Sequence, residues 1–229
     1  MNKIVQKKAV RVDQILAREY GTKKFNRGTD SLTELVVTIL SQNTNDTNRD
    51  RAFAGLKTQF PAWEDVVKAS PEKLADAIKV GGLAKIKSER IVRMLKSLQK
   101  AHGELDLDFL DTMTDEQVRE YLLKIDGVGP KTAACVLAFS LGRDVMPVDT
   151  HVHRVSSRLG LLPAKMTAEQ AHDYFLQLVG IVGLYQFHLN LIAHGRQVCK
   201  AQHPLCDKCK LKRLCRFYAQ ISGSKEAAA

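Results

Sequence analysis

The sequence predicts an all-α fold. Helix-capping signatures recur along the chain, and the apolar residues that follow them return at helical spacing. No segment alternates apolar and polar residues convincingly, as a strand on a sheet surface would. Of the 229 residues, 45% are hydrophobic, which is enough to bury one large or two modest cores.

The helix boundaries follow from capping chemistry, in chain order. The predicted helix starts are Ser31–Glu34, Ser70–Pro71, Thr114–Gln117 and Thr167–Gln170. Gly103 is typical of the residue that ends a helix. The predicted core positions on these helices are Leu35, Val36, Ile39, Leu40, Ile91, Met94, Leu95, Leu98, Val118, Tyr121, Leu122, Ala171, Phe175 and Leu178. The last residues, 220–229, are expected to form a flexible tail.

A short glycine-rich turn, I-D-G-V-G-P-K at residues 125–131, joins two predicted helices. Gly127 and Gly129 permit close backbone approach, and Pro130 suits the first turn of a helix whose free amides attract anions. Glycines between helices often serve the turn alone. The sharper hypothesis is a helix-hairpin-helix that grips a phosphate of a DNA backbone.

Lys131 falls in the first turn of the second helix, where the helix dipole disfavours a positive charge. A neutral amine is a nucleophile that can form a Schiff base, provided that a carboxylate helps to move protons. Asp149 lies eighteen residues on, before a helix with Val152, Val155 and Leu159 on one face. It is either a plain N-cap or a rigidly held catalytic carboxylate.

Four of the five cysteines cluster near the C-terminus as C-x6-C-x2-C-x5-C: Cys199, Cys206, Cys209 and Cys215. No apolar signal segment begins the chain, so reduced thiolates that bind a metal are favoured over disulfides. The single C-x2-C knuckle favours an iron–sulfur cluster, although four thiolates also suit zinc. Cys135, within A-A-C-V-L, is expected to be a buried apolar residue.

The charge of +10 favours a polyanionic partner, and it is concentrated at the two ends of the chain. Residues 1–28 carry eight Lys or Arg against two acidic residues, and residues 199–219 carry six against one. If the fold brings the ends together, one basic surface results. Solvated helix faces are the alternative. No apolar run is long enough to span a membrane, which predicts a cytoplasmic location.

Together, G-V-G-P-K-T-A at 127–133, V-D-T-H-V-H-R-V at 148–155 and the cysteine loop at 199–215 closely resemble the endonuclease III family of DNA repair glycosylases. The resemblance covers about residues 3–218. It implies a helix-hairpin-helix DNA glycosylase fold with a six-helix barrel domain at 29–143. A second, iron–sulfur cluster domain would combine 1–28 with 144–219 and hold a 4Fe-4S cluster on the four cysteines.

The resemblance also implies the roles of individual residues. Lys131 would attack the sugar of a flipped-out damaged nucleotide, displace an oxidised pyrimidine and then nick the strand by β-elimination, with Asp149 as its carboxylate partner. The partner would be double-stranded DNA with damaged bases or abasic sites, bound by a monomer and, in a bacterial cell, at the nucleoid. The residues implied to contact DNA are Gln42, Asn43, Leu83, Gly127, Gly129, Thr132 and His151.

Some positions leave alternatives open. The wedge that fills the vacated base stack is Gln42 by identity or Asn43 by ungapped position, whereas Leu83 matches the second wedge cleanly. By physical reasoning alone, Leu83 would be an ordinary core leucine. Asp126 departs from the proline of many relatives and adds a negative charge beside the hairpin. Competing functions are a lysine-free glycosylase that uses activated water, and a non-catalytic DNA-binding module with structural zinc.

Overall fold

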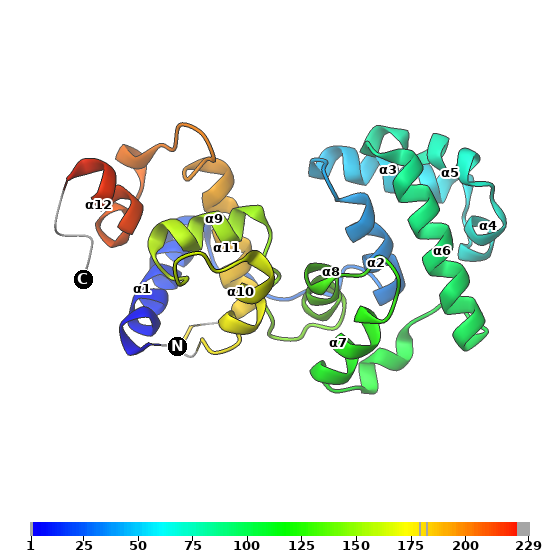
Figure 1. Cartoon of the computed structure of the whole chain (residues 1–229), viewed down its shortest axis with the longest axis horizontal. Coiled ribbons are helices and arrows are strands. Elements are labelled where there is room, and N and C mark those ends of the chain that lie inside the picture. Colours follow the sequence, from blue (N-terminus) through cyan, green and yellow to red (C-terminus); the bar gives the residue numbers. More distant parts are fainter. Residues whose placement is uncertain (1, 179, 182, 224–229) are drawn as a thin grey trace. The chain divides into compact units, whose positions relative to one another are not determined.

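The structure is a computed structural model that describes residues 2–178, 180–181 and 183–223. Every regular element in these ranges is a helix, so the predicted all-α fold is confirmed. The chain divides into two compact units (Figure 1). One unit is residues 27–143, and the other combines residues 1–26 with 144–229.

The 27–143 unit packs its helices around an apolar core. Its elements are α2 (Ser31–Leu40), α3 (Asp46–Gln59), α4 (Trp63–Lys68), α5 (Pro71–Ile78), η1 (Lys79–Gly81), α6 (Ala84–His102), η2 (Asp108–Thr112), α7 (Asp115–Leu123), α8 (Pro130–Cys135) and the π-helical turn η3 (Val136–Ser140). The predicted core positions on α2 and α6 are buried, as is Cys135 at 4% exposure. Gly103 ends α6 in a left-handed conformation, as predicted.

Capping explains most helix starts, with one correction. Side chains of Ser70, Thr114 and Thr167 accept backbone N–H groups at the predicted starts. The predicted capping box at Ser31 is wrong, because Asp30 is the N-cap of α2 and accepts the Thr33 N–H at 2.8 Å. A carboxylate one residue earlier takes the capping role and leaves Ser31 free for another bond.

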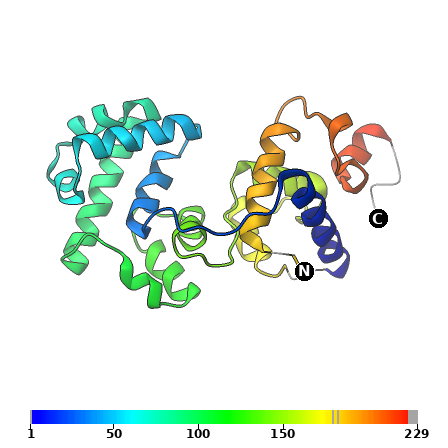
Figure 2. The ribbon, with the colours of Figure 1, turned by 180° about the vertical axis from the view of Figure 1, so that it is seen from behind.

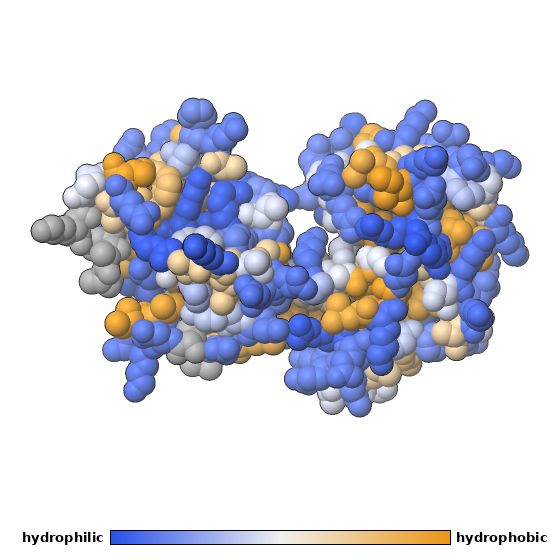
Figure 3. All heavy atoms as spheres, viewed as in Figure 1, coloured by the Kyte–Doolittle hydropathy of each residue, from blue (hydrophilic) through white to orange (hydrophobic). Residues whose placement is uncertain are grey.

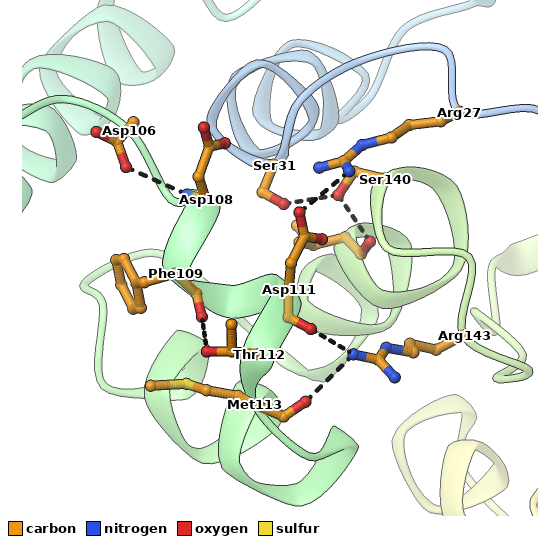
Figure 4. Close-up of polar contacts among 11 residues, drawn as sticks. Arg27, Ser31, Asp106, Asp108, Phe109, Asp111, Thr112, Met113, Ser140 and Arg143 are labelled. Carbon is orange, nitrogen blue, oxygen red and sulfur yellow. Dashed lines mark hydrogen bonds and ion pairs between the residues drawn. The ribbon is translucent and has the colours of Figure 1, made fainter.

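The Ser31 hydroxyl, which does not cap the helix, forms a 2.9 Å hydrogen bond with the Ser140 hydroxyl and so joins α2 to η3 (Figure 4). The two ends of the unit meet nearby at turn η2. Arg27 pairs with the Asp111 carboxylate at 3.1 Å, and Arg143 donates to the carbonyls of Asp111 and Met113 at 3.1 and 3.2 Å (Figure 4). These contacts close the unit where its chain enters and leaves.

The other unit joins both ends of the chain. Its elements are α1 (Lys3–Tyr20), α9 (Thr150–Leu159), α10 (Ala168–Phe175), α11 (Leu184–Gln197), η4 (Cys206–Lys208), η5 (Lys212–Leu214) and α12 (Arg216–Ser222). Helix α1 lies beside α11 in both ribbon views (Figures 1 and 2). Gln186 on α11 donates to Asp13 at 3.3 Å and accepts the Lys23 N–H at 3.2 Å. The two basic chain ends therefore belong to one unit.

The core of this unit contains apolar residues of α1, α9, α10, α11 and the cysteine loop. The predicted face of α9 (Val152, Val155 and Leu159) is buried, as are Ala171, Phe175 and Leu178. Helix α12 extends to Ser222, into the predicted tail at 220–229, of which residues 224–229 lie outside the described residues.

Most of the surface seen in Figure 3 is hydrophilic, with exposed apolar side chains in small patches. No helix among the described residues is long and apolar enough to cross a membrane.

Candidate functional site

The hairpin at residues 124–130 has the predicted geometry. Helix α7 ends at Leu123, and two turn bonds follow: Ile125 N–H to the Leu122 carbonyl at 3.1 Å, and Val128 N–H to the Ile125 carbonyl at 3.0 Å. Gly127 has φ +83°, a conformation that favours glycine. Gly129 is the N-cap of α8, and a side chain added there would meet nothing within 4 Å. This open backbone could approach a ligand closely.

Lys131 and Thr132 follow directly in the first turn of α8. Lys131 is half-buried. Thr132 is only 4% exposed, and its backbone N–H is one of the first amides of α8. The first turn of α8 thus contains both the Lys131 side chain and backbone N–H groups that have no partner within the helix.

Glu34, on α2, is a charged neighbour of Lys131 that sequence reasoning missed, since its spacing suggested only a capping role. The hydroxyls of Thr29 and Thr38 each donate to its carboxylate at 3.2 Å. Burial raises the pKa of the Glu34 carboxyl above its ordinary value of 4.5, while these bonds and the cations Arg49 and Lys131 oppose the rise. Glu34 is therefore a partly buried carboxyl group close to the Lys131 amine.

The raised pKa of Glu34 predicts a pH-dependent stability. The folded state binds the proton more readily than the unfolded chain, so the free energy of unfolding should fall as pH rises from 4.5 through the raised pKa. In Glu34→Gln this fall should be lost, so the variant should gain stability relative to the parent on raising the pH. Urea unfolding between pH 4.5 and 8 measures the difference, with exposed Glu120→Gln as control. If the difference in the free energy of unfolding between parent and Glu34→Gln is constant over this range, the pKa of Glu34 is not raised in the folded state.

Two loops at the ends of α2 and η1 carry the predicted wedge residues. Asn43 is exposed and has φ +52°, and Leu83 is 48% exposed with φ +50°. The interpretation of Leu83 as a core leucine is therefore wrong. A left-handed backbone costs a residue such as leucine about 1–2 kcal/mol, whereas asparagine tolerates it better. Gln42 instead accepts a 2.7 Å bond from Arg90, which turns its amide toward α6.

Asp126 lies next to Gly127 in the hairpin, and its negative charge is paired locally. Arg93 on α6 contacts the Asp126 carboxylate at 2.7 Å, and both side chains are more than half exposed. The pair offsets the charge that the sequence places beside the turn, although an exposed ion pair contributes little stability.

Asp149 lies in the other unit and caps α9, as one of its two interpretations predicts. Its Oδ1 accepts the Val152 N–H at 2.7 Å, which fixes the carboxylate and leaves Oδ2 for another partner. His151, two residues on, places Nδ1 3.1 Å from the Arg154 guanidinium. Burial lowers the pKa of His151, so its imidazole is held neutral near pH 7.

The irregular segment that leads to Asp149 is fixed from several sides. The Asp144 carboxylate accepts the Leu184 N–H at 2.6 Å, and His188 Nδ1 lies 2.7 Å from the Pro147 carbonyl. His172 Nδ1 lies 3.2 Å from the Met146 carbonyl. Asp149 is thus positioned by bonds to α10 and α11. Lys131 belongs to the 27–143 unit, whereas Asp149 belongs to the unit that joins both chain ends.

The four clustered cysteines line one pocket together with His194 and Arg158. Burial is the largest of the causes that raise the pKa of the Cys209 thiol to about 11, and the other three cysteines raise it further. Burial likewise raises the pKa values of Cys206 and Cys215. The four thiols lie close enough to influence one another, and a cation would be needed to keep them ionised.

Hydrogen-bond donors surround the pocket. Arg158 Nη1 lies 3.4 Å from Cys199 Sγ and also donates to the Lys200 carbonyl at 2.6 Å. His194 Nε2 lies 3.5 Å from Cys209 Sγ, while the hydroxyl of Tyr20 lies 3.0 Å from its other ring nitrogen. In the described residues, however, no three His, Cys, Asp or Glu side chains meet as closely as ligands of a single metal ion.

Comparisons with known proteins agree on one family. Residues 36–180 match the family model described as HhH-GPD superfamily base excision DNA repair protein. The chain is 37% identical over 206 residues to endonuclease III of Thermotoga maritima, covering 89% of this chain and 92% of that protein. It is 40% identical over 178 residues to a putative DNA glycosylase of Arabidopsis thaliana, of which it spans 57% of the length.

Solved structures agree on the fold. A non-covalent complex of endonuclease III with DNA matches with a TM-score of 0.81 at 24% identity, covering 95% of this chain and 98% of the other. At this level of identity the match supports the fold alone. The predicted helix-hairpin-helix DNA glycosylase fold is thereby confirmed.

Proposed function

Because this chain belongs to the endonuclease III family of the HhH-GPD superfamily of base excision DNA repair proteins, we propose that it is a bifunctional DNA glycosylase and AP lyase. Its substrate would be double-stranded DNA that contains oxidised pyrimidines or abasic sites. The observation that carries the proposal is the position of half-buried Lys131 in the first turn of α8, directly after the open hairpin.

In this proposal the Nζ lone pair of Lys131 forms a bond to the anomeric carbon of the sugar. The bond between sugar and base breaks, and its electron pair leaves with the base, which takes up a proton. Nζ then loses a proton, the C1′–O4′ ring bond breaks as O4′ takes up a proton, and the opened sugar is held as a Schiff base. Loss of a proton from its C2′ expels the 3′ phosphate and nicks the strand. The second oxygen of the Asp149 carboxylate would assist these proton movements.

The hairpin and the wedge residues would contact different parts of the DNA. The backbone N–H groups around Gly127, Gly129 and Thr132 suit a phosphate, because they lie at the positive end of α8. Exposed Asn43 and Leu83 would fill the stack that the damaged nucleotide leaves. We assign the first wedge to Asn43 rather than Gln42, because Arg90 holds the Gln42 side chain. His151 would contact the backbone near Asp149.

We further propose that the 27–143 unit is the helical barrel domain and that the other unit is a cluster domain with a 4Fe-4S cluster on Cys199, Cys206, Cys209 and Cys215. The donor set supports this, since four thiols line one pocket, with the Arg158 guanidinium near Cys199 and a ring nitrogen of His194 near Cys209. Four clustered thiolates also suit a tetrahedral zinc ion, so metal analysis decides between the two. When bound, the cluster would order the cysteine loop.

Metal analysis tests this cofactor. Protein purified without oxygen should contain iron and absorb in the visible blue. Cys209→Ser should lose both iron and colour and unfold at a lower temperature, because a ligand and the order it imposes are removed. Cys135→Ser is the matched control, since this buried cysteine lies in the other unit. Zinc in place of iron would overturn the cluster proposal.

A panel of duplexes tests the activity. Each duplex carries one oxidised pyrimidine, uracil, mismatch or abasic site, and base release and strand cleavage are measured separately. We expect base release from the oxidised pyrimidine and cleavage at the abasic site. Release of a base without strand cleavage would favour a lysine-free glycosylase mechanism, and binding without either reaction would favour a DNA-binding module.

A further inference from the structure

Helix α6 carries four basic residues at a spacing of three, Lys87, Arg90, Arg93 and Lys96, of which the first three contact neighbouring loops. Residues at this spacing lie along one side of a helix. Each of the three contacts a loop to which a DNA-binding role is proposed above. The side of α6 that bears them therefore joins the two wedge loops and the hairpin, all within the 27–143 unit.

Lys87 lies at the junction of the two wedge loops. Its side chain is 2% exposed, and its ammonium donates to the carbonyls of Leu40 and Gly81, both at 2.8 Å. Leu40 ends α2 immediately before the Asn43 loop, and Gly81 ends η1 two residues before Leu83. A single buried cation thus fixes the entry to both loops, and at α2 it also lies at the negative end of the helix.

Lys87 also stabilises the strained conformation of Leu83. A left-handed leucine persists only where its surroundings over-determine it. The Lys87 ammonium fixes the peptide two residues before Leu83, and the Lys87 backbone N–H bonds to the Leu83 carbonyl at 3.0 Å. The Lys87 side chain thus fixes the Gly81 carbonyl before Leu83, and the Lys87 backbone fixes the Leu83 carbonyl itself.

Arg90 extends the connection to the hairpin. Its Nη1 donates to Gln42 Oε1 at 2.7 Å, next to the exposed Asn43. The stem of Arg90 lies across Gly127, where an added Cβ would come within 2.7 Å of Arg90 Cδ. Gly127 therefore serves this close approach as well as its own turn, and Arg90 contacts the first wedge loop and the phosphate-binding hairpin together.

We propose that Lys87 and Arg90 are positioning residues that hold the two wedges and the hairpin in register, so that the protein grips the backbone and extrudes the base in one geometry. This inference rests on the proposed function. A misplacement of about 1 Å in such a site can slow a reaction on the order of a hundredfold. The loss of rate should affect the excision of a base, which must first be unstacked, more than cleavage at an abasic site, which has no base to unstack.

Two reactions of the same enzyme test the inference. Both use Lys131, but excision of an oxidised pyrimidine from duplex DNA needs a base to be flipped, whereas cleavage at a preformed abasic site does not. In single-turnover assays at saturating enzyme, Lys87→Met should slow excision by at least about tenfold and abasic-site cleavage by less than about threefold. Lys96→Met, exposed on the same helix, should change neither.

Equal slowing of both reactions would overturn the inference, because general structural damage affects them alike, and so would no slowing. If thermal unfolding shows that Lys87→Met does not fold, Arg90→Met is tested instead, by comparing the slowing of excision with the slowing of abasic-site cleavage. Methionine keeps an apolar stem over Gly127 and removes only the bond to Gln42. Failure of the parent protein to perform either reaction would instead refute the proposed function.

Discussion

Replacing Lys131 by Gln should reduce strand cleavage at abasic sites to background while the protein still folds and binds abasic DNA. The amide of glutamine cannot form a Schiff base, so the covalent path is lost. The substitution removes the amine of half-buried Lys131 and should leave the α7–α8 hairpin intact, since the turn bonds use only backbone groups. Gel-based cleavage and fluorescence anisotropy on the same duplex separate the reaction from binding.

Lys124→Gln is the matched control. Lys124 is exposed at the end of α7, so the substitution removes a positive charge from the same hairpin without touching the start of α8. It should retain strand cleavage. If both variants lost activity together, charge near the hairpin rather than the Lys131 amine would be the essential feature.

Replacing Asp149 by Asn should slow base excision on the order of a hundredfold or more, the scale of lost acid–base assistance. Asparagine is as good an N-cap as aspartate, so its side-chain oxygen should keep the bond to the Val152 N–H and the fold of α9. Single-turnover base release measures the rate, and thermal unfolding measures the fold.

Asp30→Asn makes the same chemical change at the N-cap of α2 and should leave the excision rate nearly unchanged. A plain capping role for Asp149 predicts that the two variants behave alike. Comparable rates for Asp149→Asn and Asp30→Asn would therefore remove Asp149 from the chemistry.

Local signals in the sequence predicted the helices well. Caps and apolar spacing act within a turn or two of chain, so the starts at Ser70, Thr114 and Thr167 followed from residue type. The start of α2 was missed because two adjacent residues can both cap, and only packing shows that Ser31 bonds to Ser140, far along the chain.

Long-range contacts explain what sequence reasoning missed. In the sequence, Lys87 is one of several basic residues on the same helix, and nothing in the pattern predicts its burial. Only the folded structure shows that its ammonium lies between two carbonyl groups. Glu34 similarly reads as part of a cap, although its carboxylate lies among threonines near Lys131. The backbone of Leu83 and the bond from Arg90 to Gln42 are likewise set by tertiary structure.

The covalent step is tested most directly by reduction of the intermediate. Borohydride added during the reaction with an oxidised pyrimidine or abasic site should trap a protein–DNA adduct, and peptide mapping by mass spectrometry should place the DNA remnant on Lys131. The adduct should be absent with Lys131→Gln. An adduct that forms with this variant at the parent rate, or that maps to another amine, would contradict the role of Lys131 and with it the proposed mechanism.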